Sequence, residues 1–234
     1  MLVVTAHPDD VDFGAAGTVA AWVKKSSEVA YCIVTDGDAG GSDRSVPRAD
    51  MARLRQSEQR AAAAELGVTE VTFLGYPDGR LVPSVQLRCD VSRVVRQFRP
   101  DRLLCQSPER NWDRIGASHP DHLAAGEAAL CAAYPDARNP FAHPELLQEG
   151  LEPHSVEEVW LMASARPNRA VDITATFERK LVALTCHDSQ VAHEADLEGR
   201  LRGWAMAGAA EAGLGEGRLA ELFQVVVMPP SGSS

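Results

Sequence analysis

The sequence has 234 residues, 45% of them hydrophobic and 24% charged, which suits one large folded domain better than two small ones. The formal net charge of -10 argues against a general binder of nucleic acids or anionic membranes, because both partners are polyanions. The five cysteines include no C-x-x-C pair, so the sequence predicts neither a disulfide framework nor a thiolate zinc site. No apolar run approaches the roughly 20 residues of a membrane span and no leader pattern comes first, so we expect a cytoplasmic protein.

The first two-thirds of the chain alternates short apolar runs with longer helical patterns. This alternation is typical of repeated βαβ units on a mostly parallel sheet. We predict strands at 2–6, 29–35, 71–74 and 102–105, and helices at 14–25, 48–66, 85–98 and 120–133. Further along, we predict strands at 156–162, 170–173 and 223–228, and helices at 176–187 and 194–212. The pattern indicates one Rossmann-like α/β domain over residues 1–228, with helices flanking the sheet and an active site at the carboxyl edge of the strands. A frayed C-terminal tail follows at 229–234.

Residues 134–154 are rich in Pro, Glu and Asn and predict a long surface excursion, of a kind that can cover an active site. We expect His143 and His154 within it, and His193 further on, to be exposed. The apolar final strand at 223–228 offers an interface for a homo-oligomer.

Three polar side chains, His7, Asp9 and Asp10, follow directly on the first predicted strand. Ligands of open parallel sheets bind beyond the carboxyl ends of the strands, so these groups fall in the expected crevice. Imidazole nitrogens and carboxylate oxygens are zinc ligands, and a hydrolytic zinc site keeps one position open beside three protein ligands. A set of two histidines and one aspartate satisfies this requirement.

A second cluster, His119-Pro120-Asp121-His122, lies at the predicted start of a helix. His7 and Asp10 are three residues apart (10 - 7), as are His119 and His122 (122 - 119), and one turn aims such a pair in one direction. The two clusters contain more groups than three ligands require. The remainder is available for proton transfer, which hydrolysis needs at the attacking water and at the departing amine.

The two motifs together, A-H-P-D-D and H-P-D-H, resemble those of the LmbE or PIG-L family of metal-dependent deacetylases. The resemblance extends through Thr35-Asp36-Gly37-Asp38-Ala39-Gly40, Arg55-x-x-Glu58, Leu66-Gly67, Pro77-Asp78-Gly79-Arg80-Leu81, Val171-Asp172-Ile173-Thr174 and His187-Asp188-Ser189-Gln190. It therefore covers nearly the whole chain. It implies a hydrolase that removes an N-acyl group, N-acetyl in the first instance, from a glucosamine-type substrate.

Carried over by motif, the resemblance implies a zinc site, with another divalent metal such as Fe2+ as the alternative ion. The implied ligands are His7, Asp10 and His122. Asp9 corresponds to the general base, and His119 to a second catalytic histidine with Asp121 as its partner. The implied mechanism has Asp9 deprotonate a metal-bound water that attacks the amide carbonyl, while the ion and protonated His119 stabilise the oxyanion.

Several further residues have competing interpretations. By resemblance Arg55 lies near the substrate and Asp78 reaches a sugar hydroxyl, whereas charge pairing along its helix is the structural alternative for Arg55. Asp12 stands where the family often has Glu, which leaves its supporting role open. For His187, a structural role at a helix end competes with a substrate-facing one. We expect Trp112 to form a sugar-stacking wall, and the other tryptophans to serve the core: Trp22, Trp160 and Trp204.

Glycine-rich segments suggest two other sites. The segment at 14–17 lacks the G-x-G-x-x-G spacing, so we expect no nucleotide cofactor. Residues 37–41 are typical of a flexible turn, and in the alternative hypothesis Asp36 and Asp38 line the pocket.

Two other functions stay open at this point. One is a non-hydrolytic, metal-binding family member in a biosynthetic pathway, against which the intact Asp9, His119 and Asp121 argue. The other is an amidase acting on a non-sugar natural-product intermediate, because the metal chemistry is the same for any amide. The expected partner is a small N-acyl amino-sugar-like molecule, and neither a nucleic acid nor a membrane.

Overall fold

The computed structural model describes residues 1–41, 43 and 45–230. Among them, seven strands form one sheet in the order β3-β2-β1-β4-β5-β7-β6. The strands are β1 (Leu2–Thr5), β2 (Ala30–Thr35), β3 (Glu70–Tyr76), β4 (Arg102–Gln106), β5 (Glu158–Met162), β6 (Arg169–Asp172) and β7 (Ala220–Val227). The helices are α1 (Asp10–Lys24), α2 (Arg48–Leu66), α3 (Val85–Phe98), α4 (Pro120–Cys131), α5 (Pro144–Gln148), α6 (Phe177–Thr185), α7 (Asp188–Val191) and α8 (Leu197–Glu211), with a 3-10 turn at Ile115–Ala117 and a π-helical turn at Ala132–Asp136.

The sheet is mostly parallel, as predicted. Strands β1 to β5 pair in parallel, and β7 runs antiparallel to β5 and to β6. All four residues of β1 are buried, as expected for a strand covered on both faces. The chain moves outward from β1 through β2 to β3, then returns to place β4 on the other side of β1. The carboxyl ends of β1 and β4 therefore flank a switch point, where such sheets bind ligands.

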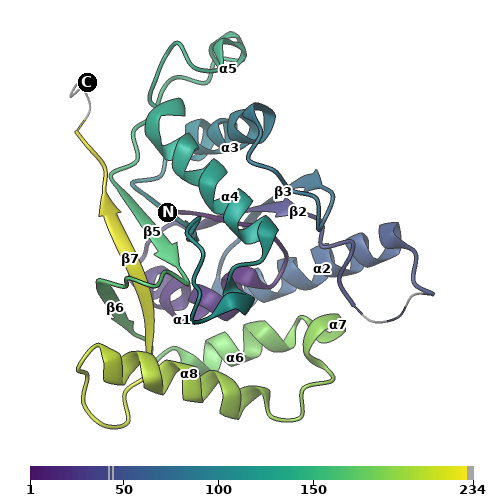
Figure 1. Ribbon diagram of the computed structural model, residues 1–234, viewed down its shortest axis with the longest axis vertical. Helices are drawn as coiled ribbons and strands as arrows, with labels where there is room; N and C mark the ends of the chain where they lie inside the picture. The colour runs from purple at the N-terminus through teal and green to yellow at the C-terminus, as the bar shows by residue number, and fades with distance from the viewer. Residues whose placement is uncertain (42, 44, 231–234) are drawn as a thin grey trace.

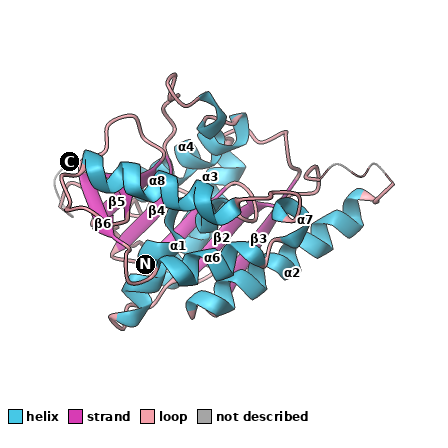
Figure 2. Cartoon of the chain, turned by 90° about the horizontal axis from the view of Figure 1, so that it is seen from below, coloured by secondary structure: helices cyan, strands magenta, loops and turns pink. Residues whose placement is uncertain are grey.

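Helices cover both faces of the sheet (Figure 1). Alternate β1 residues point to opposite faces: Leu2 and Val4 pack with α3 and α4 in one core, and Val3 packs with α1 and α2 in another. A third apolar cluster joins α6 to α8, outside α1. Figure 2, seen from below, shows α6 and α8 on the same side of the sheet as α1. The predicted α/β class with flanking helices is confirmed.

The structure corrects several local predictions. The first helix begins at Asp10 rather than residue 14, directly on the first motif. The final strand begins at residue 220 rather than 223, and it pairs with β6 over 220–223 and with β5 over 224–227. Trp204 is 48% exposed rather than buried in the core. Of the predicted frayed tail, Pro229 and Pro230 accept hydrogen bonds from Arg138, and 231–234 lie outside the described residues.

The predicted excursion at 134–154 is fastened to α3. The buried Arg96 side chain donates to the carbonyl oxygens of Asp136, Ala137, Asn139, Ala142 and Leu151. The excursion also contains a short helix of its own, α5. Figure 1 shows this segment beside α3, at the end of the molecule away from α6 and α8.

Candidate metal centre

Three side chains from the two sequence motifs converge at the switch point. The His7 Nδ1 atom lies 3.2 Å from His122 Nε2, and each nitrogen lies close to the Asp10 carboxylate, at 3.4 and 3.0 Å. His7 follows β1, Asp10 begins α1 and His122 sits in the first turn of α4. Gly126, one turn further along α4, allows α4 to lie close to the end of β4. A Cβ at this position would lie 2.3 Å from the Gln106 carbonyl oxygen.

The outer nitrogen of each imidazole faces an acceptor. His7 Nε2 lies 3.1 Å from Asp78 Oδ1 and 3.3 Å from Asp121 Oδ2. His122 Nδ1 lies 3.2 Å from the Ala117 carbonyl oxygen. Metal-binding histidines usually donate their other ring N–H to such a partner, which fixes the tautomer and the ring orientation. The inner nitrogens of His7 and His122 are thereby left with their lone pairs directed at one point beside Asp10.

The electrostatics of this cluster favour positive charge. Burial alone would lower the pKa of His7, but hydrogen bonds and charges of Asp10 and Asp78 raise it to about 11. Burial alone would raise the pKa of Asp10, but the charges and hydrogen bonds of His122 and His7 hold it well below its usual range. The field that draws protons onto these imidazoles also draws a divalent cation, which displaces those protons on binding. Two nitrogens and a carboxylate in this arrangement fit zinc.

Two other groups that include His7 come close enough to share an ion: His7 with His119 and His122, and His7 with Asp78 and Asp121. In the second group Asp121 is already committed, since its oxygens accept from the N–H groups of Gly79 and Leu81 at 2.7 and 3.1 Å. The carboxylate predicted to partner His119 therefore lies against His7. It is the Asp121 backbone N–H that contacts His119, at 3.2 Å from Nδ1.

Asp9 occupies the N-cap of α1 in a left-handed backbone conformation, with φ of 89°. Its N–H donates to Gln59 Oε1 at 2.8 Å, and its carboxylate accepts from Arg55 Nη2 at 2.8 Å. Burial raises the pKa of the Asp9 carboxyl to about 6, although the Arg55 charge alone would lower it. A carboxylate of this kind is suited to accept and return a proton near neutral pH.

Arg55 lies inside the protein and is 4% exposed, so the solvated charge pairing considered from sequence is wrong. Besides Asp9, it donates to the carbonyl oxygens of Pro8 at 2.6 Å and Gly37 at 3.1 Å. Gly37 has a φ of +63°, and a Cβ there would lie 2.6 Å from the guanidinium, so glycine is needed at this turn. Arg55 thus joins the loops after β1 and β2 and holds the Asp9 carboxylate in place.

Asp78 also turns inward. Besides facing His7, its carboxylate accepts from the Ala39 N–H at 3.3 Å, and its own N–H donates to Asp38 at 2.9 Å. Its exposed fraction is 9%. In the structure both Arg55 and Asp78 support the cluster, and their contact with substrate stays a prediction.

A buried chain of hydrogen bonds backs Asp9. Gln59 Nε2 donates to Asp12 Oδ2 at 2.8 Å, and His187 Nε2 lies 2.9 Å from the same oxygen. Gln59, Asp12 and His187 are all fully buried. Burial alone would lower the pKa of His187, but its hydrogen bond to Asp12 and the Asp12 charge raise it. His187 lies just beyond the end of α6, its contact with Asp12 favours the structural alternative, and Asp12 links it to the segment that carries Asp9.

Gln59 was missed from sequence. One signal was available, because Arg55 and Gln59 are four residues apart on α2 and so share one helix face. That face otherwise packs Met51, Ala62, Ala63 and Leu66 into the interior. Long polar side chains within such an apolar stripe need buried partners.

His119 is the exposed member of the cluster. Its ring centroid lies 5.0 Å from that of His7 and 5.3 Å from that of His122. Partial burial and the charges of His7 and His122 lower the pKa of His119. Because its Nδ1 accepts from the Asp121 N–H, Nε2 is the nitrogen that can carry a proton. Trp112, predicted as a sugar-stacking wall, is 78% exposed with the Arg110 guanidinium 5.7 Å from its ring centroid.

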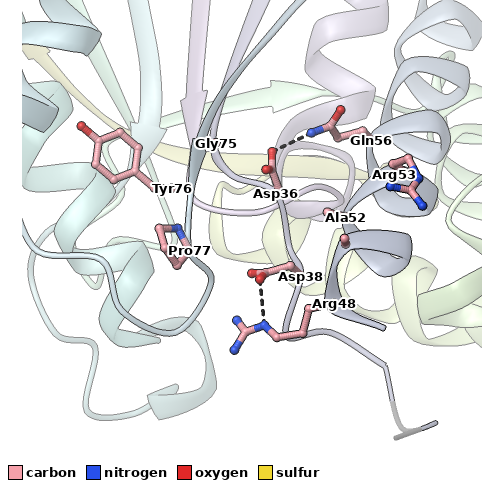
Figure 3. Close-up of a pocket in the computed structure, with 10 residues that line it drawn as sticks. Asp36, Asp38, Arg48, Ala52, Arg53, Gln56, Gly75, Tyr76 and Pro77 are labelled. Carbon is pink, nitrogen blue, oxygen red and sulfur yellow. Dashed lines mark hydrogen bonds and ion pairs between the residues drawn. The ribbon is translucent and has the colours of Figure 1, made fainter. Parts of the chain in front are cut away.

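A pocket of about 390 Å³ lies near the cluster, and Figure 3 shows the residues that line it. Asp36 and Asp38 line it together with Tyr76 from the end of β3, whereas the alternative hypothesis from sequence placed them in the active-site pocket. In Figure 3 Asp36 points to Gln56 and Asp38 to Arg48, at 2.7 and 2.8 Å. The pocket does not contain the histidines. It is joined to them through Asp38, which accepts from the N–H of Asp78.

The fold and the cluster at its switch point define an α/β enzyme with a candidate metal site. Residues 2–133 match the family described as PIG-L, GlcNAc-PI de-N-acetylase. The chain belongs to this family, the PIG-L or LmbE deacetylases, and is thus an enzyme of a class that hydrolyses amides, as the sequence motifs predicted.

Two relatives are deacetylases by name. The diacetylchitobiose deacetylase of Thermococcus kodakarensis is 32% identical over 194 residues, which cover 81% of this chain and 69% of the relative. The structure of N,N'-diacetylchitobiose deacetylase from Pyrococcus horikoshii superposes with a TM-score of 0.88 at 30% identity, covering 97% of this chain and 83% of that one. A third structure, the 4-carboxy-2-hydroxymuconate hydratase GalB of Pseudomonas putida, shares the fold with a TM-score of 0.80 at 21% identity, covering 100% and 98%.

None of the helices in the described part of the chain combines the length and the apolar character that crossing a membrane requires.

Proposed function

We propose that this protein is a zinc-dependent N-deacetylase that releases acetate from an N-acetylglucosamine-type small molecule. The observation that carries the proposal is the convergence of His7 Nδ1, His122 Nε2 and the Asp10 carboxylate beside the buried Asp9. The substrate class rests on the names of the two deacetylases, since a pocket's chemistry alone does not separate one amide from another.

His7, Asp10 and His122 would hold the ion, with Fe2+ as the alternative to zinc. When bound, such an ion lowers the pKa of a water ligand from about 15.7 towards about 7 and polarises the amide carbonyl. Asp9 accepts the proton of the attacking water at its carboxylate and returns it to the nitrogen of the departing amine. Arg55, which donates to that carboxylate at 2.8 Å, holds it in place.

His119 donates from Nε2 to the carbonyl oxygen as negative charge develops there. The Asp121 N–H fixes the His119 ring through Nδ1, which keeps the Nε2 proton directed outward. Asp121 acts mainly through His7: its carboxylate, together with that of Asp78, sets the tautomer that turns His7 Nδ1 inward. Arg55 and Asp78 thus act as positioning residues.

The test is a panel of N-acetyl compounds: N-acetylglucosamine, N,N'-diacetylchitobiose, and N-acetylated amines without a sugar. Acetate and free amine are measured together for zinc-loaded wild type, chelated wild type and Asp9→Asn. We expect equal amounts of acetate and amine from the sugar substrates, none after chelation, and a loss of about 10²- to 10⁴-fold in Asp9→Asn with its zinc retained.

The panel also separates the alternatives. Release only from the non-sugar amides would favour an amidase of a different substrate class. Zinc binding without release from any compound would contradict a hydrolytic function and favour a metal-binding family member. Because GalB has the same fold, acetate release, and not the fold, is the deciding observation.

We further propose that the protein works in the cytoplasm, where a small water-soluble substrate and five free cysteines are compatible with a reducing compartment. We also propose that identical chains associate. The outer end of β7, with Val227 75% exposed, is the strand surface that such an interface would use.

A further inference from the structure

A second cluster of metal-ligating side chains lies between α3 and the excursion at 134–154. Cys89 Sγ of α3 lies 3.2 Å from Glu145 Oε1 of α5, and His143 Nδ1 lies 3.9 Å from the same oxygen. One ligand atom from each of the three side chains falls within 4.8 Å of the other two. The cluster shares no residue with the centre around His7.

The orientation of His143 matches that of a metal-binding histidine. Its Nε2 lies 3.3 Å from Asp136 Oδ2, and Asp136 is held by two hydrogen bonds from Arg88, at 2.8 and 2.7 Å. An Nε2 proton donated to this fixed carboxylate leaves the Nδ1 lone pair facing Cys89 and Glu145. The same carboxylate support occurs at His7, and it is a general feature of histidines that bind metals.

Burial adds to this arrangement. The side chain of His143 is 8% exposed, which corrects the expectation that it is a free surface histidine. His143 has a φ of 52°, a conformation that few residues other than glycine adopt, and it directly precedes α5. Cys89 is 3% exposed. Cys89 and His143 are thus held inside the protein, and Glu145 reaches them from the surface.

The arginines near this cluster are paired with carboxylates, which weakens their repulsion of a bound cation. Arg88 is neutralised by Asp136, and Arg93 bonds both Glu149 and Asp90. Glu145 has its Oε1 directed at the Cys89 thiol, and burial and this carboxylate raise the pKa of Cys89 to about 11. A bound divalent ion reverses this, because a coordinated thiol loses its proton.

We propose that Cys89, His143 and Glu145 form a second divalent-metal site, selective for a borderline-soft ion such as zinc. Thiolate, imidazole and carboxylate are all zinc ligands, and three of them leave one position for water. Asp136 orients His143 from outside the coordination shell. An ion here fastens the start of α5 to α3 and so stabilises the excursion.

The proposal is tested with cobalt(II), which reports on sulfur ligation through thiolate-to-cobalt charge-transfer absorption. Chelated, reduced protein is titrated with the metal alone. We expect wild type to bind two equivalents, one of which produces this absorption. Cys89→Ser and His143→Ala should each lose the absorption and one equivalent, while deacetylase activity of the zinc-loaded variants stays at the wild-type level.

Cys186→Ser is the matched control, because that half-buried thiol bonds a helix carbonyl oxygen and has no place in the cluster. It should keep both equivalents and the absorption. If Cys89→Ser does not fold, Glu145→Gln replaces it: Glu145 is 51% exposed, and losing its charge should weaken cobalt binding at least about tenfold. Unchanged affinity in that variant counts against the site.

One bound equivalent without thiolate absorption in wild type, or absorption that survives Cys89→Ser, overturns the proposal. The variant His122→Ala distinguishes a failure of this second site from a failure of the proposed function. That variant should lose the other equivalent and retain the thiolate absorption, since the centre around His7 includes no sulfur ligand among the described residues.

Discussion

Residues 2–133 and residues 134–230 contribute to the centre around His7 in different ways. The first part carries both motifs, and with them every candidate ligand and proton-transfer group, each within a few residues of a strand end or a helix start. The second part completes the sheet with β5, β7 and β6 and reaches the centre indirectly, through His187 on Asp12. The reacting groups therefore come from short local motifs, whereas their support comes from the whole fold.

The largest effect on turnover is expected when a metal ligand in the first part of the chain is removed. Asp10→Ala removes the carboxylate that faces both His7 Nδ1 and His122 Nε2. The metal contribution of several kcal/mol is lost, so turnover should fall by at least about 10³-fold. Metal analysis should show the loss of the ion from this centre. The control, Asp50→Ala at an exposed position on α2, should keep both its metal and its turnover. Full metal content in Asp10→Ala would rule out this ligand.

A smaller loss of turnover is expected when the oxyanion donor is removed and the metal ligands are kept. His119→Ala should lower kcat by about 10²- to 10³-fold, the usual effect of losing one oxyanion donor, while metal content remains at the wild-type level. Steady-state kinetics and metal analysis on the same preparation check this. Wild-type turnover in the variant would refute the assigned role.

The acid limb of the kcat/KM pH profile tests whether Asp9 is the general base. Asp9 must be ionised to accept a proton; burial raises its pKa to about 6, and a bound cation opposes that rise. We therefore expect kcat/KM to increase with pH and to level off by about pH 6, with about a tenfold loss per unit below the limb. Metal content is measured at each pH, so that ion loss is not mistaken for protonation. A limb that remains in metal-loaded Asp9→Asn would contradict the assignment.

The link between the two parts is tested at Gln59. Gln59→Leu removes the acceptor for the Asp9 N–H and the donor to Asp12, and so separates His187 from the centre. Because the backbone at Asp9 then loses its support, we expect kcat to fall by about 10- to 100-fold with KM and metal content little changed. Gln86→Leu, at an exposed position on α3, is the control. An equal effect on KM and kcat, or none on either, would show that the chain of hydrogen bonds is only structural.

The smallest effect on turnover is expected deep in the second part. Lys180 of α6 contacts Glu221 of β7 at 2.5 Å and the Phe13 carbonyl oxygen at 2.6 Å, in a buried ion pair. Lys180→Met leaves the Glu221 charge buried without its partner and should lower the free energy of unfolding by about 3–5 kcal/mol. Below the unfolding transition, kcat should stay near that of wild type. Denaturant unfolding and kinetics check the two quantities, with exposed Lys24→Met as the control.

The features that sequence predicted have short periods or fixed spacings. The strand and helix alternation gave the sheet, and the pairs at 7 and 10 and at 119 and 122 pointed to one centre because their strands meet at one edge. The helix at 48–66 was predicted with its observed bounds, since Gly67 ends it with a φ of +83°.

The features that sequence missed depend on contacts between distant residues. His187 and Asp12 are 175 residues apart, and only the packing of α6 and α7 beside α1 and α2 brings them together. Arg55 and Asp78 could be recognised as polar residues near the centre, but their burial and their supporting contacts depend on the paths of three loops. The partners of Cys89 likewise follow it by more than 50 residues, so its spacing revealed no metal site.

The most direct test of the centre is the anomalous scattering of the zinc-loaded protein at the zinc absorption edge, in crystals of wild type and Asp10→Ala. We predict an ion bound by His7 Nδ1, His122 Nε2 and an Asp10 oxygen at about 2.0–2.2 Å, with Asp9 beside it and no ion at that position in the variant. An ion ligated instead by Asp78 and Asp121, or by His119, would contradict the division of these residues into ligands, supports and proton-transfer groups.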